Sequence, residues 1–296
     1  MKKTMRTLVA CILALSICLV PVPVAKADSA SVKPFIAFGA DLSAKEKKEV
    51  LKQFALTEDD LPDYETIQIT NADEHEYLDE YLASAVIGKR ALSSVMIEEA
   101  DAGSGIEVQT HNISFCTKEM YTNALVTAGI EDAKVTVAGP FPISGTAALV
   151  GAMKAYGTMT GDVIDSEQSD AATNELVVTG KLGDEIGKEE AANFVATLKN
   201  KVVSGDLSSD EEIKKAIEET EDQLNVTLSN DMKNKMVALM KKINGLDLDL
   251  DSLKDQAKGV YDKLKDMGVD IEDAEGLWDK ICDFFSGLWD KISSLF

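Results

Sequence analysis

Only two histidines, His75 and His111, could supply an imidazole for acid–base chemistry in this chain of 296 residues. Residues 106–113 alternate apolar and polar side chains, which predicts a strand with His111 on its polar face. Ser144 follows another predicted strand and begins a predicted helix, so it is a conceivable nucleophile for a histidine base. The residues around it do not form the Gly-x-Ser-x-Gly pattern of a hydrolase. The simpler alternative is a surface histidine and a helix-capping serine.

An anion is the second candidate ligand of this segment. Ser144, Gly145 and Thr146 stand at a predicted helix start, where free backbone N–H groups and the helix dipole favour negative charge. The lysine of a nucleotide-binding P-loop is missing here. Plain helix capping is therefore the simpler role.

The acidic residues, cysteines and histidines do not complete a metal-binding pattern. The segment 247–252 begins like a calcium loop, but Ser252 and Lys258 stand where the loop requires glycine and glutamate. The spacing of the cysteines and histidines does not fit zinc. We expect no metal site and no cofactor.

The first 27 residues have the order of a secretory signal peptide. A basic start is followed by the apolar run 7–20 and by the small-residue cleavage site 25–27. A run of 14 residues is shorter than the roughly 20 that span a membrane, so an uncleaved anchor is the weaker alternative. Neither Cys11 nor Cys18 fits a lipid-attachment pattern. We predict cleavage after Ala27 and an extracellular or cell-envelope location.

The mature chain is strongly acidic. Cleavage removes four of the 30 basic residues and none of the 52 acidic ones, so the formal charge changes from −22 to −26. Such a chain repels nucleic acid and anionic lipid, because phosphate binding requires clustered lysine and arginine. A hydrophobic content of 45% is sufficient for a packed core. Of the cysteines, Cys116 and Cys282 remain, and they fit either one disulfide or two buried thiols.

Residues 28–157 alternate strands and helices, which predicts an α/β or α+β domain with a mixed sheet. The predicted strands are 35–38, 64–70, 91–97, 106–113 and 135–138, and the predicted helices begin near 43, 71, 117 and 144. The glycine-containing segment 101–105 predicts a hairpin between the third and fourth strands. Placing Ser43 on Thr117 aligns two related strand–helix–strand–helix units, which is a hypothesis about topology.

The chain becomes purely helical after a polar linker at 158–170. The region 171–275 contains four amphipathic helix patterns, at 189–203, 209–224, 229–243 and 253–267. Each pattern has one apolar face that needs a partner helix, so an all-α region is predicted.

The last segment, 276–296, repeats the residues Gly-Leu-Trp-Asp-Lys-Ile after 11 positions. This spacing equals three helical turns and predicts an amphipathic helix with one apolar stripe. The stripe is the predicted binding surface, and its central residues are Trp278, Ile281, Phe285, Trp289 and Ile292. It could contact a membrane surface, a partner protein, a second copy of the chain, or the protein's own helices.

Four short motifs in the first 200 residues carry a family resemblance. They are Gly39–Ser43, Arg90–Ser93, Thr110–Ile113 and Pro140–Leu149. Together they resemble the YpuA-like family of exported Firmicutes proteins, a domain of unknown function. The resemblance implies a Gram-positive secreted or envelope protein without an established activity, and it supplies no catalytic residues.

These observations favour a secreted or envelope protein of unknown function that binds a partner and is not an enzyme. The expected partner is an envelope or extracellular protein, or a membrane surface contacted by the tail, and self-association is a further option. Nucleic acid is excluded by the charge. The alternative is an extracellular hydrolase or transferase that uses His111 and Ser144.

Overall fold

A computed structural model describes residues 33–161, 164–246, 248, 252, 253, 256, 258 and 259. The chain divides into residues 1–31 and a compact unit, Val32–Phe296, which contains every described residue. The predicted signal peptide, the predicted tail helix with its two tryptophans, and Cys282 lie outside the described residues. No helix in the described part of the chain is long and apolar enough to cross a membrane.

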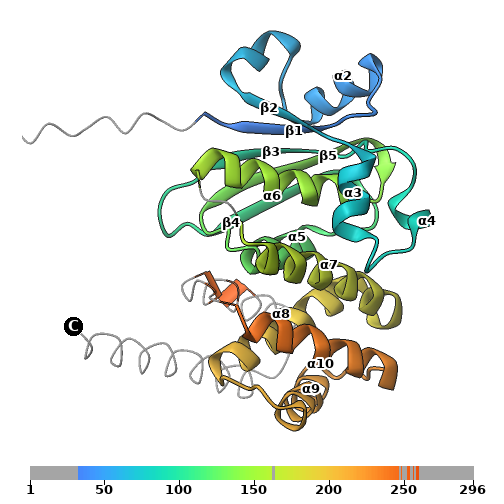
Figure 1. Ribbon diagram of the computed structural model, residues 1–296, viewed down its shortest axis with the longest axis vertical. Helices are drawn as coiled ribbons and strands as arrows, with labels where there is room; N and C mark the ends of the chain where they lie inside the picture. Colours follow the sequence, from blue (N-terminus) through green and yellow to red (C-terminus); the bar gives the residue numbers. More distant parts are fainter. Residues whose placement is uncertain are drawn as a thin grey trace, which may run out of the picture. The chain divides into compact units, whose positions relative to one another are not determined.

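The centre of the fold is a mixed five-stranded sheet (Figure 1). Its strands, in the spatial order β2-β1-β3-β5-β4, are β2 (Glu65–Ile69), β1 (Phe35–Gly39), β3 (Ser94–Glu99), β5 (Ala133–Ile143) and β4 (Ile106–Ile113). β1 pairs in parallel with β2, and β4 with β5, whereas β3 is antiparallel to both β1 and β5. The predicted mixed sheet, followed by a helical part, is confirmed, and the fold class is α+β.

The predicted hairpin between the third and fourth strands is wrong, because β5 lies between β3 and β4. The turn does form, but it is bonded to the start of β5. The Asp132 carboxylate accepts hydrogen bonds from the backbone N–H groups of Gly103 at 2.9 Å and Gly105 at 2.7 Å. β5 also continues beyond the predicted strand 135–138, since Ile143 still pairs with Ile113 of β4.

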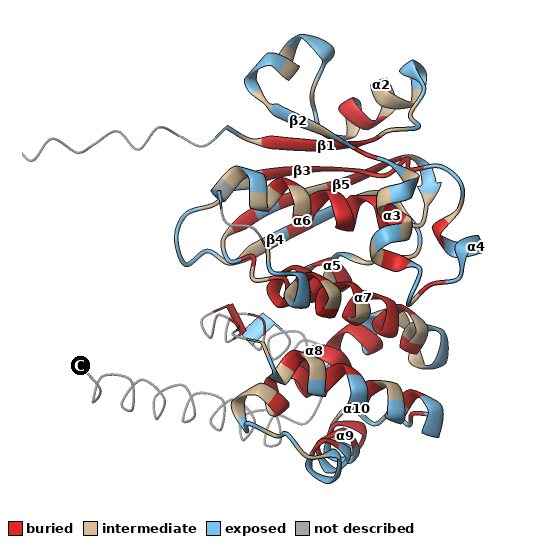
Figure 2. Cartoon of the chain, viewed as in Figure 1, coloured by how far each residue is buried: buried red, intermediate tan, exposed pale blue. Residues whose placement is uncertain are grey.

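Helices cover both faces of the sheet. α2 (Ala44–Gln53) packs on one face, against Ile36, Phe38 and Met96. The other face is covered by α3 (Asn71–Leu78), α5 (Lys118–Thr127) and α6 (Thr146–Thr160). The approach of α6 is close, because a Cβ atom on its Gly151 would lie 2.8 Å from that of Ala37 in β1. Figure 2 shows the central strands β1 and β3 as largely buried.

The two predicted strand–helix–strand–helix units are present in the order of elements. They are β1-α2-β2-α3 and β4-α5-β5-α6. Their packing differs, because α2 and α5 cover opposite faces of the sheet. The first unit is also irregular, because η1 (Glu58–Asp63) follows α2. The helix predicted to begin near 71 ends at Leu78, and a short α4 (Ser84–Ile87) follows it.

Four helices follow the sheet: α7 (Ser166–Ile186), α8 (Lys188–Ser204), α9 (Asp210–Leu224) and α10 (Asn230–Asn244). The last three match the predicted helix patterns. α7 joins the two parts, because it packs on α5 and also on α8 and α10 (Figure 1). α6 and α7 both extend into 158–170, the segment expected as a linker. The predicted domain boundaries at 157 and 171 remain a prediction.

Candidate functional site

The four motifs of the family resemblance meet at one end of the sheet, where the parallel strands finish. Three of them lie at the carboxyl ends of the parallel strands β1, β4 and β5, and Arg90–Ser93 directly precedes the antiparallel β3. Because β3 runs in the opposite direction, its start lies where the other strands end. The carboxyl ends of parallel strands are the usual place for ligand sites in open sheets.

The polar groups at this end of the sheet form hydrogen bonds mainly with one another. The Asp41 carboxylate accepts from the backbone N–H of Ala91 at 2.8 Å. Arg90 donates to the Asp41 carbonyl oxygen at 2.8 Å and to the Glu46 carboxylate at 2.9 Å. Hydrogen bonds from Ser43, followed by that from Arg90, lower the pKa of Glu46 to about 2. These bonds hold the loop after β1 against the segment that enters β3.

A buried carboxyl group, Glu74 of α3, lies beside the start of α6. It is 2% exposed and accepts hydrogen bonds from the Thr146 hydroxyl at 2.7 Å and the Asn71 amide at 3.3 Å. Burial raises the pKa of Glu74. Ser144 precedes the N-cap, which is Gly145, and its hydroxyl lies 3.2 Å from that of Thr146. The Thr146 hydroxyl, part of the predicted anion site, is thus bonded to the protein's own carboxyl group.

His111 and Ser144 are not joined by a hydrogen bond in the described part of the chain. His111 pairs with Ala138 in the sheet, and both belong to the face that α2 covers. Ser144 contacts the start of α6, which lies on the other face. The two cavities described below are lined by neither residue. The catalytic pair stays a prediction without geometric support.

The cysteine within the described residues, Cys116, is a buried free thiol. Burial raises its pKa to about 12, so the reactive thiolate form is negligible at neutral pH. No group of three or more His, Cys, Asp or Glu side chains in the described ranges could hold a metal ion.

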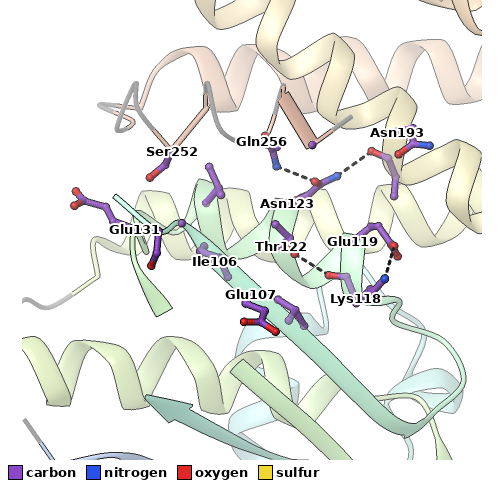
Figure 3. Close-up of a pocket in the computed structure, with 16 residues that line it drawn as sticks. Ile106, Glu107, Lys118, Glu119, Thr122, Asn123, Glu131, Asn193, Ser252 and Gln256 are labelled. Atoms are coloured by element: carbon purple, nitrogen blue, oxygen red, sulfur yellow. Dashed lines mark hydrogen bonds and ion pairs between the residues drawn. The ribbon is translucent and has the colours of Figure 1, made fainter. Parts of the chain in front are cut away.

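A cavity of about 370 Å³ opens between β4, α5 and the start of α8 (Figure 3). This volume lies within the range of small-molecule sites. Its apolar wall comes from Ile106, Val108, Val126 and Ala192, and the residues 252, 256 and 259 line the opposite side. A second, wider cavity of about 1070 Å³ lies along α3, α6 and α7 and includes Lys154.

Buried amide side chains distinguish the first cavity. Asn123 donates to the Ala192 carbonyl oxygen at 3.0 Å and accepts from Gln256 at 2.8 Å (Figure 3). Gln256 is 8% exposed, and its side-chain carbonyl oxygen has no hydrogen-bond partner among the described residues. Asn193, 4% exposed, lines the same space. A buried acceptor without a partner is costly, so a bound donor would lower the free energy.

The cavity has an acidic lining. Its charged residues are Glu107, Glu119 and Glu131, together with Lys118, which forms an ion pair with Glu119 at 3.8 Å. The lining therefore favours neutral or cationic ligands over anions.

A fully buried ion pair lies next to this cavity. The Lys199 ammonium group donates to the Glu175 carboxylate at 2.9 Å, the backbone carbonyl oxygen of Asn123 at 2.9 Å and the Thr127 hydroxyl at 3.0 Å. Glu175 and Lys199 are both 0% exposed. Burial raises the pKa of Glu175 and lowers the pKa of Lys199. The pair connects α5, α7 and α8 behind the cavity wall.

Apolar periodicity in the sequence predicts neither the cavity nor the ion pair. Lys199 lies four residues after Val195 and eight after Ala191, so it falls on the buried face of its helix. That spacing is the signal that could have identified it. Glu175 lies in α7, whose buried residues include many small ones, so its apolar pattern is weak.

The fold and the cavity define an α+β protein with a ligand-sized polar cavity beside a sheet edge. Residues 38–260 match the family described as "Protein of unknown function (DUF1002)". The chain is 39% identical over 287 residues to "Uncharacterized protein YpuA" of Bacillus subtilis (strain 168), covering 96% of this chain and 97% of that protein. The chain belongs to this YpuA-like family of unknown function, which confirms the resemblance. No solved structure matches it significantly.

Proposed function

We propose that this protein is an exported, non-enzymatic binding protein whose ligand occupies the cavity between β4, α5 and α8. The observation that carries the proposal is the buried carbonyl oxygen of Gln256, which lacks a partner among the described residues and borders a cavity lined by further amides. Amide groups of fixed orientation recognise neutral polar groups through paired donors and acceptors. The positions of His111 and Ser144 do not support the enzyme alternative.

Side-chain amide resonances offer a direct test. The protein beginning at Asp28 would be ¹⁵N-labelled and titrated with N-acetylglucosamine, N-acetylalanine methylamide and inorganic phosphate. We expect saturable shifts of the Asn123, Asn193 and Gln256 amide signals with a neutral probe and none with phosphate. Absence of a saturable shift with every probe would refute the proposal.

A cavity-filling variant gives the matched comparison. Thr122 of α5 lines the cavity and donates to the carbonyl oxygen four residues earlier at 3.0 Å, so Thr122→Trp fills the space without removing a tertiary bond. Thr158 of α6 makes the same local bond at 2.8 Å but is distant in sequence and lines the other cavity. Thr122→Trp should abolish the shifts and Thr158→Trp should preserve them; the reverse pattern would place the ligand elsewhere.

Export and attachment are further parts of the proposal. The signal-like segment ending at Ala27 supports export, and the apolar stripe of 276–296 supports contact with a membrane surface or an envelope partner. Fractionation of the producing cell should place the full chain in the envelope and a chain ending before Gly276 in the medium. Equal release of both chains would refute attachment through the tail, and retention of both in the cytoplasm would refute export.

A further inference from the structure

The outer edge of β4 is open among the described residues, since β4 is the last strand of the sheet and pairs only with β5. Ile106 is in register with Ala133, whose N–H donates to the Gly105 carbonyl oxygen at 3.2 Å. In a parallel ladder this geometry directs the backbone groups of 107 and 109 toward β5. The N–H and C=O groups of Ile106 and Val108 therefore point away from the sheet.

The open edge and the cavity adjoin each other. Residues 104–108 line the cavity, and the side chains of Ile106 and Val108 lie on the sheet face that α5 covers. A chain lying along this edge would meet backbone donors and acceptors on β4. Every second side chain of that chain would point toward the amide-lined space between β4 and α5.

We propose that this edge and cavity together bind an extended basic peptide, which adds to β4 as a sixth strand. The inference rests on the proposed function and names its ligand class. Three features select such a peptide. The backbone edge pairs with a strand, and the amides of Asn123 and Gln256 suit peptide or amide groups. The lining contains three carboxylates and one ammonium group, and this net negative charge favours lysine or arginine.

The opposite edge strand, β2, provides an internal control. It is the other end strand of the sheet, but neither cavity described above is lined by any of its residues. A peptide that needed only a free edge would bind both strands. A peptide that also uses the cavity should bind β4 alone.

The test uses a fluorescein-labelled decapeptide of alternating valine and lysine, titrated by fluorescence anisotropy. Two further peptides carry N-methyl groups on alternate residues, one on the valines and one on the lysines. Only one set of N–H groups faces β4, so one methylated peptide should bind at least tenfold more weakly than the other, because its methyl groups remove the hydrogen bonds to β4. Equal binding of the two methylated peptides would overturn strand addition.

Charge variants test the basic preference. A peptide with glutamate in place of lysine should bind at least tenfold more weakly. Glu131→Gln in the cavity lining should weaken binding of the lysine peptide about two- to fivefold, in the range of exposed ion pairs, whereas Glu65→Gln on β2 should leave it unchanged. Equal losses in the two variants, or equal binding of the lysine and glutamate peptides, would overturn the assignment to β4 and its acidic cavity.

The outcomes separate the two proposals. Amide signals that shift with the small neutral probes, combined with no binding of any peptide, would overturn the peptide inference and leave the cavity as a site for another ligand. Failure of both the small probes and the peptides would overturn both.

Discussion

The buried pair of Glu175 and Lys199 makes a quantitative prediction about stability. Replacing Lys199 with methionine removes the group that donates to Glu175, to the Asn123 carbonyl and to the Thr127 hydroxyl. Among the described residues, Glu175 then keeps only its hydrogen bond from Thr127, in a site that is 0% exposed. Breaking a buried ion pair in this way costs about 3–5 kcal/mol. Lys199→Met should lower the free energy of unfolding by that amount in urea titrations followed by circular dichroism.

The stability deficit of Lys199→Met should also depend on pH, in a direction that the pKa of Glu175 sets. In the variant, burial without a cation holds the folded pKa of Glu175 above its unfolded value, because the neutral form is favoured. Stability from such a group is fully present below the unfolded pKa and is lost as the pH rises through the folded pKa. The deficit of Lys199→Met should therefore be smallest near pH 4 and increase toward pH 7.

Two further variants control this experiment. Lys199→Met combined with Glu175→Met removes both charges, so most of the lost stability should return. Lys235→Met removes an exposed ion pair with Asp231 and should cost less than about 1 kcal/mol. A loss below 1 kcal/mol for Lys199→Met, or no recovery in the double variant, would refute the reasoning.

Three other variants test residues near the carboxyl ends of the parallel strands. Gly145 has a φ of +97° and its added Cβ would overlap the Tyr121 hydroxyl, so Gly145→Ala should lower the free energy of unfolding by about 1–3 kcal/mol in urea; an unchanged midpoint would contradict this. Ser43→Ala removes the side-chain cap of α2 and should cost about 1 kcal/mol in the same assay, whereas no loss would show that the cap is dispensable. Glu74→Gln removes a buried carboxyl group of raised pKa. The native protein should lose stability as the pH rises from about 4 to neutrality, because Glu74 then ionises in a buried site, and the variant should keep that stability. Parallel pH profiles of the two proteins would refute this prediction.

Local chemistry made several elements predictable from the sequence. Ser43 and Glu46 form a capping box at the start of α2, and Thr117 caps α5, so both helices begin where they were predicted. The predicted strand 64–70 matches β2, and the three-to-four-residue apolar period located α8, α9 and α10. These signals act within a few residues, so one chain segment contains all the information that they require.

Strand pairing was not predictable by the same means. The segment 101–105 has the composition of a hairpin turn, and it does form a turn. Its Gly103 and Gly105 N–H groups bond to Asp132, nearly 30 residues away, and β5 takes the position beside β3. Pairing depends on contacts between distant segments, which a local turn signal does not encode.

The sequence by itself determined the acidic charge, the family motifs, the mixed strand–helix order and the helical second half. Only the tertiary structure placed the four motifs at one end of the sheet, paired Glu175 with Lys199, and formed the amide-lined cavity beside β4. The physical reason is that a buried charge or amide is stable only when a partner from another element satisfies it. That partner is defined by packing, not by spacing along the chain.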